Sequence, residues 1–226
     1  MIKQPSEVNI WTVVVAAGSG SRFGAQKQFL DLCGERVIDR SVRIAATQSH
    51  GVVVVLPVAS AENGAALGLL ADPDTSIKIV AGAGSRSGSV RNGLAAVPQS
   101  ADVILIHDGA RPLASASVYE RVISAVAAGA DAVVPVVSVT DTIRDLRGGV
   151  VDRSALVAVQ TPQGFPSSSI RRAHAAGDEA TDDATLVEAN GGKVVLVEGD
   201  PDNIKITDPS DLDIARLLLR RREENP

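Results

Sequence analysis

The chain has 226 residues, of which 45% are hydrophobic and only 2% aromatic, and its formal net charge is −5. A chain of this length can bury a full hydrophobic core, and one domain is the expected number. The acidic balance argues against an extended nucleic-acid surface, and the scarcity of aromatic residues argues against a platform for stacking single-stranded bases.

The sequence also bears on the cellular location. Its first residues carry no apolar segment of the kind found in signal peptides. No apolar run approaches the roughly twenty residues of a membrane-spanning helix. Cys33 is the single cysteine, so no disulfide can form within the chain. We therefore expect a cytoplasmic protein with no membrane partner and no nucleic-acid partner.

Strand-like apolar runs alternate with segments of helical periodicity along the first part of the chain. The expected strands cover residues 9–17, 52–57, 76–82, part of 101–112, and 131–137. The expected helices cover residues 37–48, 59–71, a segment from 85–89 to just before Pro98, and a segment around 118–126. This alternation predicts an α/β protein with a mostly parallel sheet and helices on both faces.

The alternation stops between Val139 and Val159. Two short apolar segments flank Gly148 and Gly149, which predicts a two-stranded hairpin. An isolated hairpin is marginally stable in water, so it needs a surface to pack on, and a second subunit would supply one. We expect residues 139–159 to form a protruding β-arm, within a single domain of residues 1–226, that joins two chains in a homodimer.

The last third returns to helices and a strand. Helices are expected at residues 167–176 and 182–190, followed by a strand at 193–199. The final helix should begin at Thr207 or Asp208, because Pro209 suits a first turn and arginines follow late in the segment.

The stretch "VVVAAGSGSRFGAQKQF", residues 13–29, leads from a strand into a glycine-rich turn with two basic residues. The dinucleotide-binding pattern fails because Phe23 stands where a third glycine is needed, and the P-loop pattern has no Gly-Lys-Ser/Thr. What is left is a loop whose backbone N–H groups can surround a phosphate, with Arg22 and Lys27 adding charge. An ordinary solvated loop with two surface charges is the alternative.

Asp108 directly follows a buried type of strand, where open α/β sheets place ligand-binding groups. An Asp-Gly hairpin turn is disfavoured, because Arg111 and Pro112 lead into a helix rather than a returning strand. A carboxylate at this position could hold a metal-bound water or a sugar hydroxyl.

Two further stretches are candidates for a binding site. "AGAGSRSGSVRNGL" offers small polar donors and a helix N-terminus to an anion or a base edge, but a plain helix cap by Ser85 or Ser87 is equally compatible. In "NIKITDP" Lys205 would point away from Ile204 and Ile206, as in any alternating strand. The histidines show no metal-ligand spacing and there is no G-x-S-x-G, so neither a metallohydrolase nor an esterase is indicated.

Seven stretches together resemble one known family. "AAGSGSRFGAQKQF", "GSRSGSVRNGL", "HDGARP", "DT", "DRSALVAVQTPQGF", "TDDA" and "NIKIT" occur in the order seen in the 2-C-methyl-D-erythritol 4-phosphate cytidylyltransferases, between about Val13 and Leu217. One departure is Ala83, which follows Gly82 where the family often has a second glycine. The sequence ends after the last expected helix, so it resembles the single-function form rather than a fusion with a later pathway enzyme.

The resemblance implies a Rossmann-like fold with a β-arm that clasps a second subunit. It implies a reaction of the non-mevalonate isoprenoid pathway. In it CTP and 2-C-methyl-D-erythritol 4-phosphate give 4-diphosphocytidyl-2-C-methyl-D-erythritol and pyrophosphate, with Mg²⁺ required. The nucleophile would be a phosphate monoester, already mostly dianionic near pH 7 because its second pKa is about 6, so no general base is needed.

The resemblance also assigns residues to roles. Those that would act in catalysis, by stabilising the transition state or positioning the substrate phosphate, are Arg22, Lys27, Arg153 and Lys205. Those that would bind the nucleotide are Ala16, Ala17, Gly18, Gly20, Gly82, Ser89 and Asp108. Those that would bind the second substrate are Asp108, Arg111, Thr142, Arg153, Thr181 and Lys205. Asp108 would also approach the Mg²⁺ ion, through water, while the CTP phosphates supply most of its ligands.

Two alternatives stay open. A cytidylyltransferase for another polyol phosphate, such as ribitol 5-phosphate, would share the nucleotide half of the site. A non-catalytic nucleotide-binding module would have no use for Lys27, Arg153 and Lys205 together.

Overall fold

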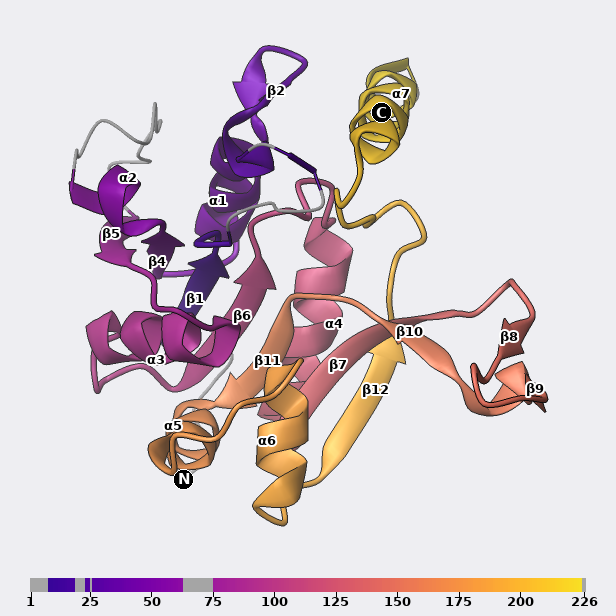
Figure 1. The fold of residues 1–226 in the computed structure, drawn as a ribbon. Coiled ribbons are helices and arrows are strands. Elements are labelled where there is room, and N and C mark those ends of the chain that lie inside the picture. The colour runs from indigo at the N-terminus through magenta and orange to yellow at the C-terminus, as the bar shows by residue number, and fades with distance from the viewer. Residues whose placement is uncertain (1–7, 19–22, 25, 63–74, 225–226) are drawn as a thin grey trace.

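The computed structural model describes residues 8–18, 23–24, 26–62 and 75–224 of the chain (Figure 1). In this described part, eight strands form one sheet. They are β1 (Ile10–Val15), β4 (Gly51–Leu56), β5 (Ser76–Ala81), β6 (Val103–Asp108), β7 (Ala132–Ser138), β10 (Val157–Val159), β11 (Gln163–Pro166) and β12 (Val194–Glu198). The pairs β1–β4, β1–β6, β4–β5 and β7–β12 are parallel, which confirms the predicted, mostly parallel sheet.

The sequence did not predict β11. This strand pairs antiparallel with both β6 and β7 and so separates two strands that would otherwise be neighbours. Val133 of β7 pairs with Gly164 of β11 and with Val195 of β12, so β11 and β12 must lie along opposite edges of β7. By the same reasoning at Val136, β10 lies along the β11 edge. Residues 157–159, within the range predicted for the arm, therefore belong to the main sheet.

Helices cover both faces of the sheet, as predicted (Figure 1). One face carries α3 (Arg86–Ala96), α5 (Ser167–Ala175) and α6 (Asp183–Ala189). The other face carries α1 (Val37–Thr47) and α4 (Ala116–Ala127). Strand residues alternate between the two cores: Val13 of β1 packs on the α3 face and Val14 on the α1 face. The apolar runs thus form strands buried on both sides.

Three smaller features complete the architecture. Helix α2 (Val58–Glu62) is the described part of the helix predicted at 59–71, and the rest of that prediction lies outside the described residues. The short strands β2 (Asp31–Leu32) and β3 (Glu35–Arg36) pair with each other ahead of α1. Helix α7 (Pro209–Glu224) packs its buried Leu212 and Leu219 in a third cluster with Ile206. In the described part of the chain, no helix has the length and apolarity to cross a membrane.

A hairpin projects from the body of the molecule beyond β7 and β10 (Figure 1). It consists of β8 (Ile143–Arg144) and β9 (Val150–Val151), which pair antiparallel, followed by the 3-10 turn η3 (Arg153–Ala155). Gly148 and Gly149 adopt φ of 126° and 85° in its turn, a region that glycine enters without steric cost. The hairpin predicted around these two glycines is present.

Candidate active site

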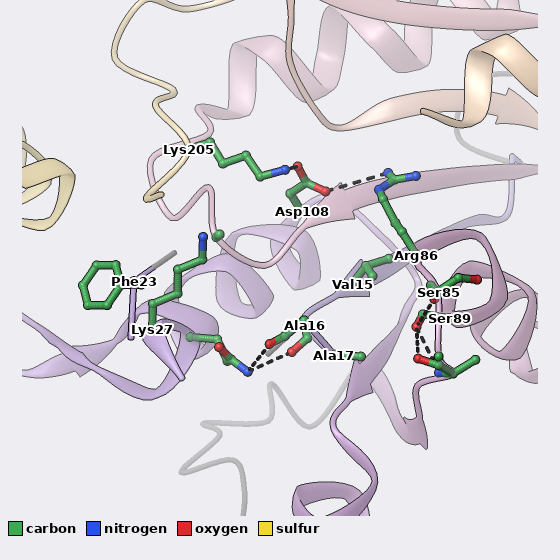
Figure 2. Close-up of a pocket in the computed structure, with 15 residues that line it drawn as sticks. Val15, Ala16, Ala17, Phe23, Lys27, Ser85, Arg86, Ser89, Asp108 and Lys205 are labelled. Atoms are coloured by element: carbon green, nitrogen blue, oxygen red, sulfur yellow. Dashed lines mark hydrogen bonds and ion pairs between the residues drawn. The ribbon is translucent and has the colours of Figure 1, made fainter. Parts of the chain in front are cut away.

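A cavity of about 540 Å³ opens where β1 and β6 end (Figure 2). Its walls come from the turn after β1, the 3-10 turn η2 (Lys27–Phe29), the N-terminal turn of α3, the end of β6 and the segment before α7. The lining residues are Val15, Ala16, Ala17, Gly18, Phe23, Lys27, Gln28, Ala83, Gly84, Ser85, Arg86, Ser89, Asp108, Ala110 and Lys205. The carboxyl ends of parallel strands are where ligands bind in open α/β sheets.

The turn after β1 is fixed by its backbone. The Ala16 N–H donates to the Val55 carbonyl at 2.8 Å, and the buried Gln28 side chain donates to the carbonyls of Ala16 and Gly18 at 3.1 and 3.3 Å. Lys27 projects from η2 into the cavity (Figure 2). Gly20 and Arg22, which the sequence also predicted here, lie outside the described residues.

The wall opposite is the junction between β5 and α3. A Cβ on Gly82 would lie 2.2 Å from the Cβ of Ala17, so only glycine lets the two strand ends approach this closely. The Ser89 hydroxyl accepts from the Ala83 N–H at 3.0 Å and donates to the Ser85 carbonyl at 2.8 Å. The turn therefore accommodates Ala83 through a hydrogen bond to Ser89, and Ser85 caps α3 by accepting from the Gly88 N–H.

Asp108 lies at the centre of the charged groups. Lys205 Nζ is 2.7 Å from its Oδ2, Arg86 NH2 is 3.8 Å from its Oδ1, and Arg111 Nε is 3.9 Å from its Oδ2. Burial alone would raise the pKa of this carboxyl, but Lys205 and then Arg86 stabilise its charge and lower the pKa to about 2. Asp108 is therefore ionised at neutral pH.

The backbone of Asp108 is fixed by a buried chain of hydrogen bonds. Its N–H donates to Thr161 Oγ1 at 3.0 Å, and Thr161 Oγ1 lies 3.1 Å from His107 Nδ1. His107 Nε2 lies 3.1 Å from the Arg111 carbonyl, which can only accept. The imidazole is thus neutral with its hydrogen on Nε2, and the Thr161 hydroxyl donates to Nδ1. Desolvation lowers the pKa of His107 to about 4, in agreement with a neutral imidazole.

Lys205 reaches the cavity because its neighbours are held elsewhere. Ile206 is fully buried and its N–H donates to the Ala110 carbonyl at 2.9 Å. The Asp211 carboxylate accepts from the N–H groups of Thr207 and Asp208 at 2.7 and 2.8 Å, which closes the start of α7. The Lys205 side chain is left 43% exposed on the cavity side.

The remaining predicted residues do not line the cavity. Arg111 lies behind Asp108 and donates to the carbonyls of Asn203 and Val159 at 2.7 and 3.1 Å. Thr142 and Arg153 lie in the hairpin region, where Arg153 NH1 donates to the Thr140 carbonyl. Thr181 lies just before α6, in a segment tied to α3 because the Ala180 N–H donates to Ser87 at 3.1 Å. The substrate-binding roles assigned to these four residues therefore stay predictions.

Sequence reasoning missed one charged residue of the cavity wall. Arg86, the first residue of α3, lines the cavity and pairs with Asp183 at 2.8 Å. Burial lowers the pKa of Arg86, but the carboxylates of Asp183 and Asp108 outweigh it and raise the value. The signal was its position beside the capping Ser85 at a strand-to-helix junction, but its partner is 97 residues away in sequence. No local pattern could identify that pair.

The fold and the cavity define an α/β protein with a charged cavity at the carboxyl end of its sheet. A glycine-rich turn, a capped helix N-terminus and two lysines meet at the carboxyl end of a parallel sheet. The chain belongs to the 2-C-methyl-D-erythritol 4-phosphate cytidylyltransferase (IspD) family, whose sequence profile matches residues 10–221. Members of this family are nucleotidyltransferases.

Curated relatives and solved structures agree with this assignment. The chain is 43% identical to a Rhodococcus jostii protein named 2-C-methyl-D-erythritol 4-phosphate cytidylyltransferase, over 92% of this chain and 93% of that protein. The Thermus thermophilus structure of that name has a TM-score of 0.76 at 35% identity, covering 95% of this chain and 99% of the other. The chain is also 42% identical to a bifunctional IspD/IspF enzyme of Solidesulfovibrio magneticus, over 91% of this chain, and spans only 56% of that enzyme's length.

Proposed function

We propose that this chain transfers the cytidylyl group of CTP to 2-C-methyl-D-erythritol 4-phosphate. The products are 4-diphosphocytidyl-2-C-methyl-D-erythritol and pyrophosphate. The observation that carries the proposal is the cavity in which Lys27 and Lys205 flank Asp108 beside the glycine-rich turns, in a member of this family. The setting is cytoplasmic, as expected for a small-molecule biosynthetic enzyme.

The chemistry requires cations more than a base. An oxygen of the substrate phosphate attacks the α-phosphorus of CTP in line, a new P–O bond forms, and the bond to the β-phosphate breaks. Pyrophosphate leaves with the electron pair. The Lys27 ammonium, with Arg22 beside it in sequence, stabilises the negative charge that develops on the α-phosphoryl oxygens and the leaving group. The only histidine near Asp108 among the described residues, His107, has a pKa of about 4 and serves structure rather than proton transfer.

The nucleotide is bound mainly by backbone and small side chains. Ala16, Ala17 and Gly18 line the cavity on one side and Ser89 lines it on the other, and Gly82 lies close to Ala17 and Ser89. A tight wall of this kind suits a pyrimidine better than a purine. Asp108, ionised and buried, accepts from ribose hydroxyls.

The second substrate is held by groups from two chains. Lys205 takes the substrate phosphate in its own cavity. Arg153 and Thr142 lie on the arm, away from the cavity of their own chain, and we propose that they enter the cavity of a partner in a homodimer. Exposed apolar residues on the arm and the adjoining strand, Val150, Val157 and Val159, suit such an interface. The family resemblance also assigns Arg111 and Thr181 to this second substrate, although neither lines the cavity of its own chain.

The described residues fit a magnesium ion that takes most of its ligands from CTP. Mg²⁺ is commonly bound by one or two carboxylates together with substrate phosphates, and Asp108 is the carboxylate on the described part of the cavity wall. Within the described residues, no three His, Cys, Asp or Glu side chains gather to form a metal site of their own. Asp108 would therefore hold the ion through water, and the bound ion would neutralise phosphate charge.

Pyrophosphate release tests the reaction. Purified protein is given CTP, Mg²⁺ and either 2-C-methyl-D-erythritol 4-phosphate or ribitol 5-phosphate, and ATP replaces CTP in a parallel series. We expect release with CTP and the erythritol substrate and at least tenfold less in each of the other combinations. Faster release with ribitol 5-phosphate would assign the chain to the alternative substrate, and comparable release with ATP would contradict the proposed base pocket.

Subunit mixing tests the shared site. Homodimers of Lys27→Ala and of Arg153→Ala should each be nearly inactive. If Arg153 acts on the partner's cavity, a mixed dimer holds one intact site and one with both lesions. Random pairing makes about half of the dimers mixed, so activity should return to roughly a quarter of wild type. No recovery after verified subunit exchange would place both residues in one chain's site.

A further inference from the structure

In the cavity wall, Arg86 is backed by two buried residues, Asp183 and His174. Each residue comes from a different helix: Arg86 begins α3, Asp183 begins α6, and His174 lies near the end of α5. Asp183 is fully buried and His174 is 4% exposed. Buried charges of this kind are costly unless they are paired, so the arrangement calls for an explanation.

The Asp183 carboxylate uses one oxygen for each partner. His174 Nε2 lies 3.0 Å from Oδ1, and Arg86 NH1 lies 2.8 Å from Oδ2. A carboxylate only accepts, so the histidine hydrogen is on Nε2. The other terminal nitrogen of Arg86, NH2, faces Asp108 Oδ1 at 3.8 Å in the cavity (Figure 2). The guanidinium thus bridges a buried carboxylate and the carboxylate of the site.

We propose that Arg86 is a positioning residue for Asp108, and that Asp183, itself bonded to His174, holds Arg86 in place. The inference rests on the proposed function, in which Asp108 contacts the nucleotide. Of the three cations around Asp108, Lys205 is 43% exposed and also serves the substrate phosphate in the proposed function, and Arg111 donates to the carbonyls of Asn203 and Val159. Arg86 is fixed from behind by Asp183, so it holds Asp108 while Lys205 shares its charge with the substrate phosphate.

Two features separate this role from phosphate binding. First, the positive charge of Arg86 is shared between Asp108 and the fully buried Asp183, which weakens its attraction for a third anion. Second, the bridge uses two different nitrogens of one planar group. A lysine ammonium is a point charge and cannot reproduce that fork. Positioning therefore needs arginine, whereas simple attraction of phosphate would be served by lysine as well.

The test is a double-mutant cycle measured as CTP affinity by calorimetry, with kcat and KM measured alongside. Arg86→Lys is made in wild type and in Asp108→Asn. We expect Arg86→Lys to weaken CTP binding about tenfold in wild type and by less than about threefold when Asp108 is asparagine, because the arginine acts through that carboxylate. Equal losses in the two backgrounds would overturn the proposal.

Two further variants separate positioning from loss of fold. Arg86→Gln combined with Asp183→Asn removes both buried charges together and should match Arg86→Lys in CTP affinity while retaining a cooperative melt. Arg91→Lys is the matched control, because Arg91 lies in the same helix and pairs with Glu179 at 2.7 Å rather than with Asp108. It should bind CTP as wild type does, and an equal loss there would contradict a specific role for Arg86.

The outcomes distinguish this proposal from the proposed function. Wild-type protein that fails to bind CTP contradicts the function before any variant is compared. A second result is CTP binding that shows the expected coupling between Arg86 and Asp108 while CTP releases no pyrophosphate with any polyol phosphate. That result contradicts the function and supports the positioning role. Turnover with an uncoupled cycle contradicts the positioning role alone.

Discussion

Acid should destabilise this protein through His107. The residue is fully buried, its Nε2–H donates to the Arg111 carbonyl, and its Nδ1 accepts from Thr161. Protonating Nδ1 would set its new N–H against the Thr161 hydroxyl hydrogen that points at it, and would place a positive charge in a fully buried site. The folded state therefore resists a proton that the unfolded chain binds readily.

The magnitude follows from the two pKa values. Desolvation lowers the pKa of His107 from 6.5 in the unfolded chain to about 4 in the folded one. Above the unfolded pKa both states are neutral and stability is complete. As the pH falls, the unfolded state binds a proton first, so stability is lost between the two values. The loss amounts to about 2 kcal/mol by pH 5 and about 3 kcal/mol by pH 4.

Urea denaturation between pH 7.5 and pH 4 measures this effect, with His107→Gln as the test variant. The glutamine does not titrate, so its free energy of unfolding should fall with acid by about 2 kcal/mol less than that of wild type at pH 5. His50→Gln, at an exposed histidine whose Nδ1 accepts from the Ile10 N–H, controls for loss of an imidazole. Parallel curves for wild type and His107→Gln would refute the assignment of a neutral, buried His107.

Two other substitutions bear on the site itself. Lys27→Ala should lower kcat by about 10²–10³-fold with little change in CTP affinity, because its charge acts on the transition state; a raised KM with normal kcat would make it a ground-state contact. Gly82→Ala should weaken CTP binding and cost about 1–3 kcal/mol in unfolding free energy, since its Cβ would lie 2.2 Å from that of Ala17. Gly84→Ala in the same turn meets nothing within 4 Å, so it should leave stability near wild type, and an equal loss there would contradict the steric argument.

The sheet could be predicted because its signals are local. Val52 to Val55 form an unbroken β-branched run, and in the structure alternate residues of this run face the two cores. The hairpin was equally predictable, since Gly148 and Gly149 mark a turn with positive φ. Asp108 was found because an acidic residue that follows a buried strand is conspicuous in its own segment.

Features that depend on distant pairing could not be predicted. Strand β11 reads "QGFP", with a glycine and a proline that local propensity places outside strands. It is a strand because it pairs with β6 and β7. Its glycine lets α4 pack closely on it, since a Cβ on Gly164 would lie 2.4 Å from a methyl carbon of Val122. Arg86 was missed for the same reason, since its role is set by carboxylates on β6 and α6.

In the proposed function an acidic chain binds a polyanion, and the distribution of its charges accounts for this. The net charge is −5, yet the described residues that line the cavity include two lysines, Lys27 and Lys205, and one carboxylate, Asp108, while the charge of Arg86 is shared between Asp108 and Asp183. Inside the cavity, low-dielectric walls strengthen the field of these cations. Asp108 reduces this field, but it also orients the cations. It holds Lys205 at 2.7 Å and Arg86 at 3.8 Å in defined positions, so the cations are already oriented when a nucleotide arrives. Orientation before binding is what makes electrostatic stabilisation effective in catalysis, because no charged group must then reorganise during the reaction.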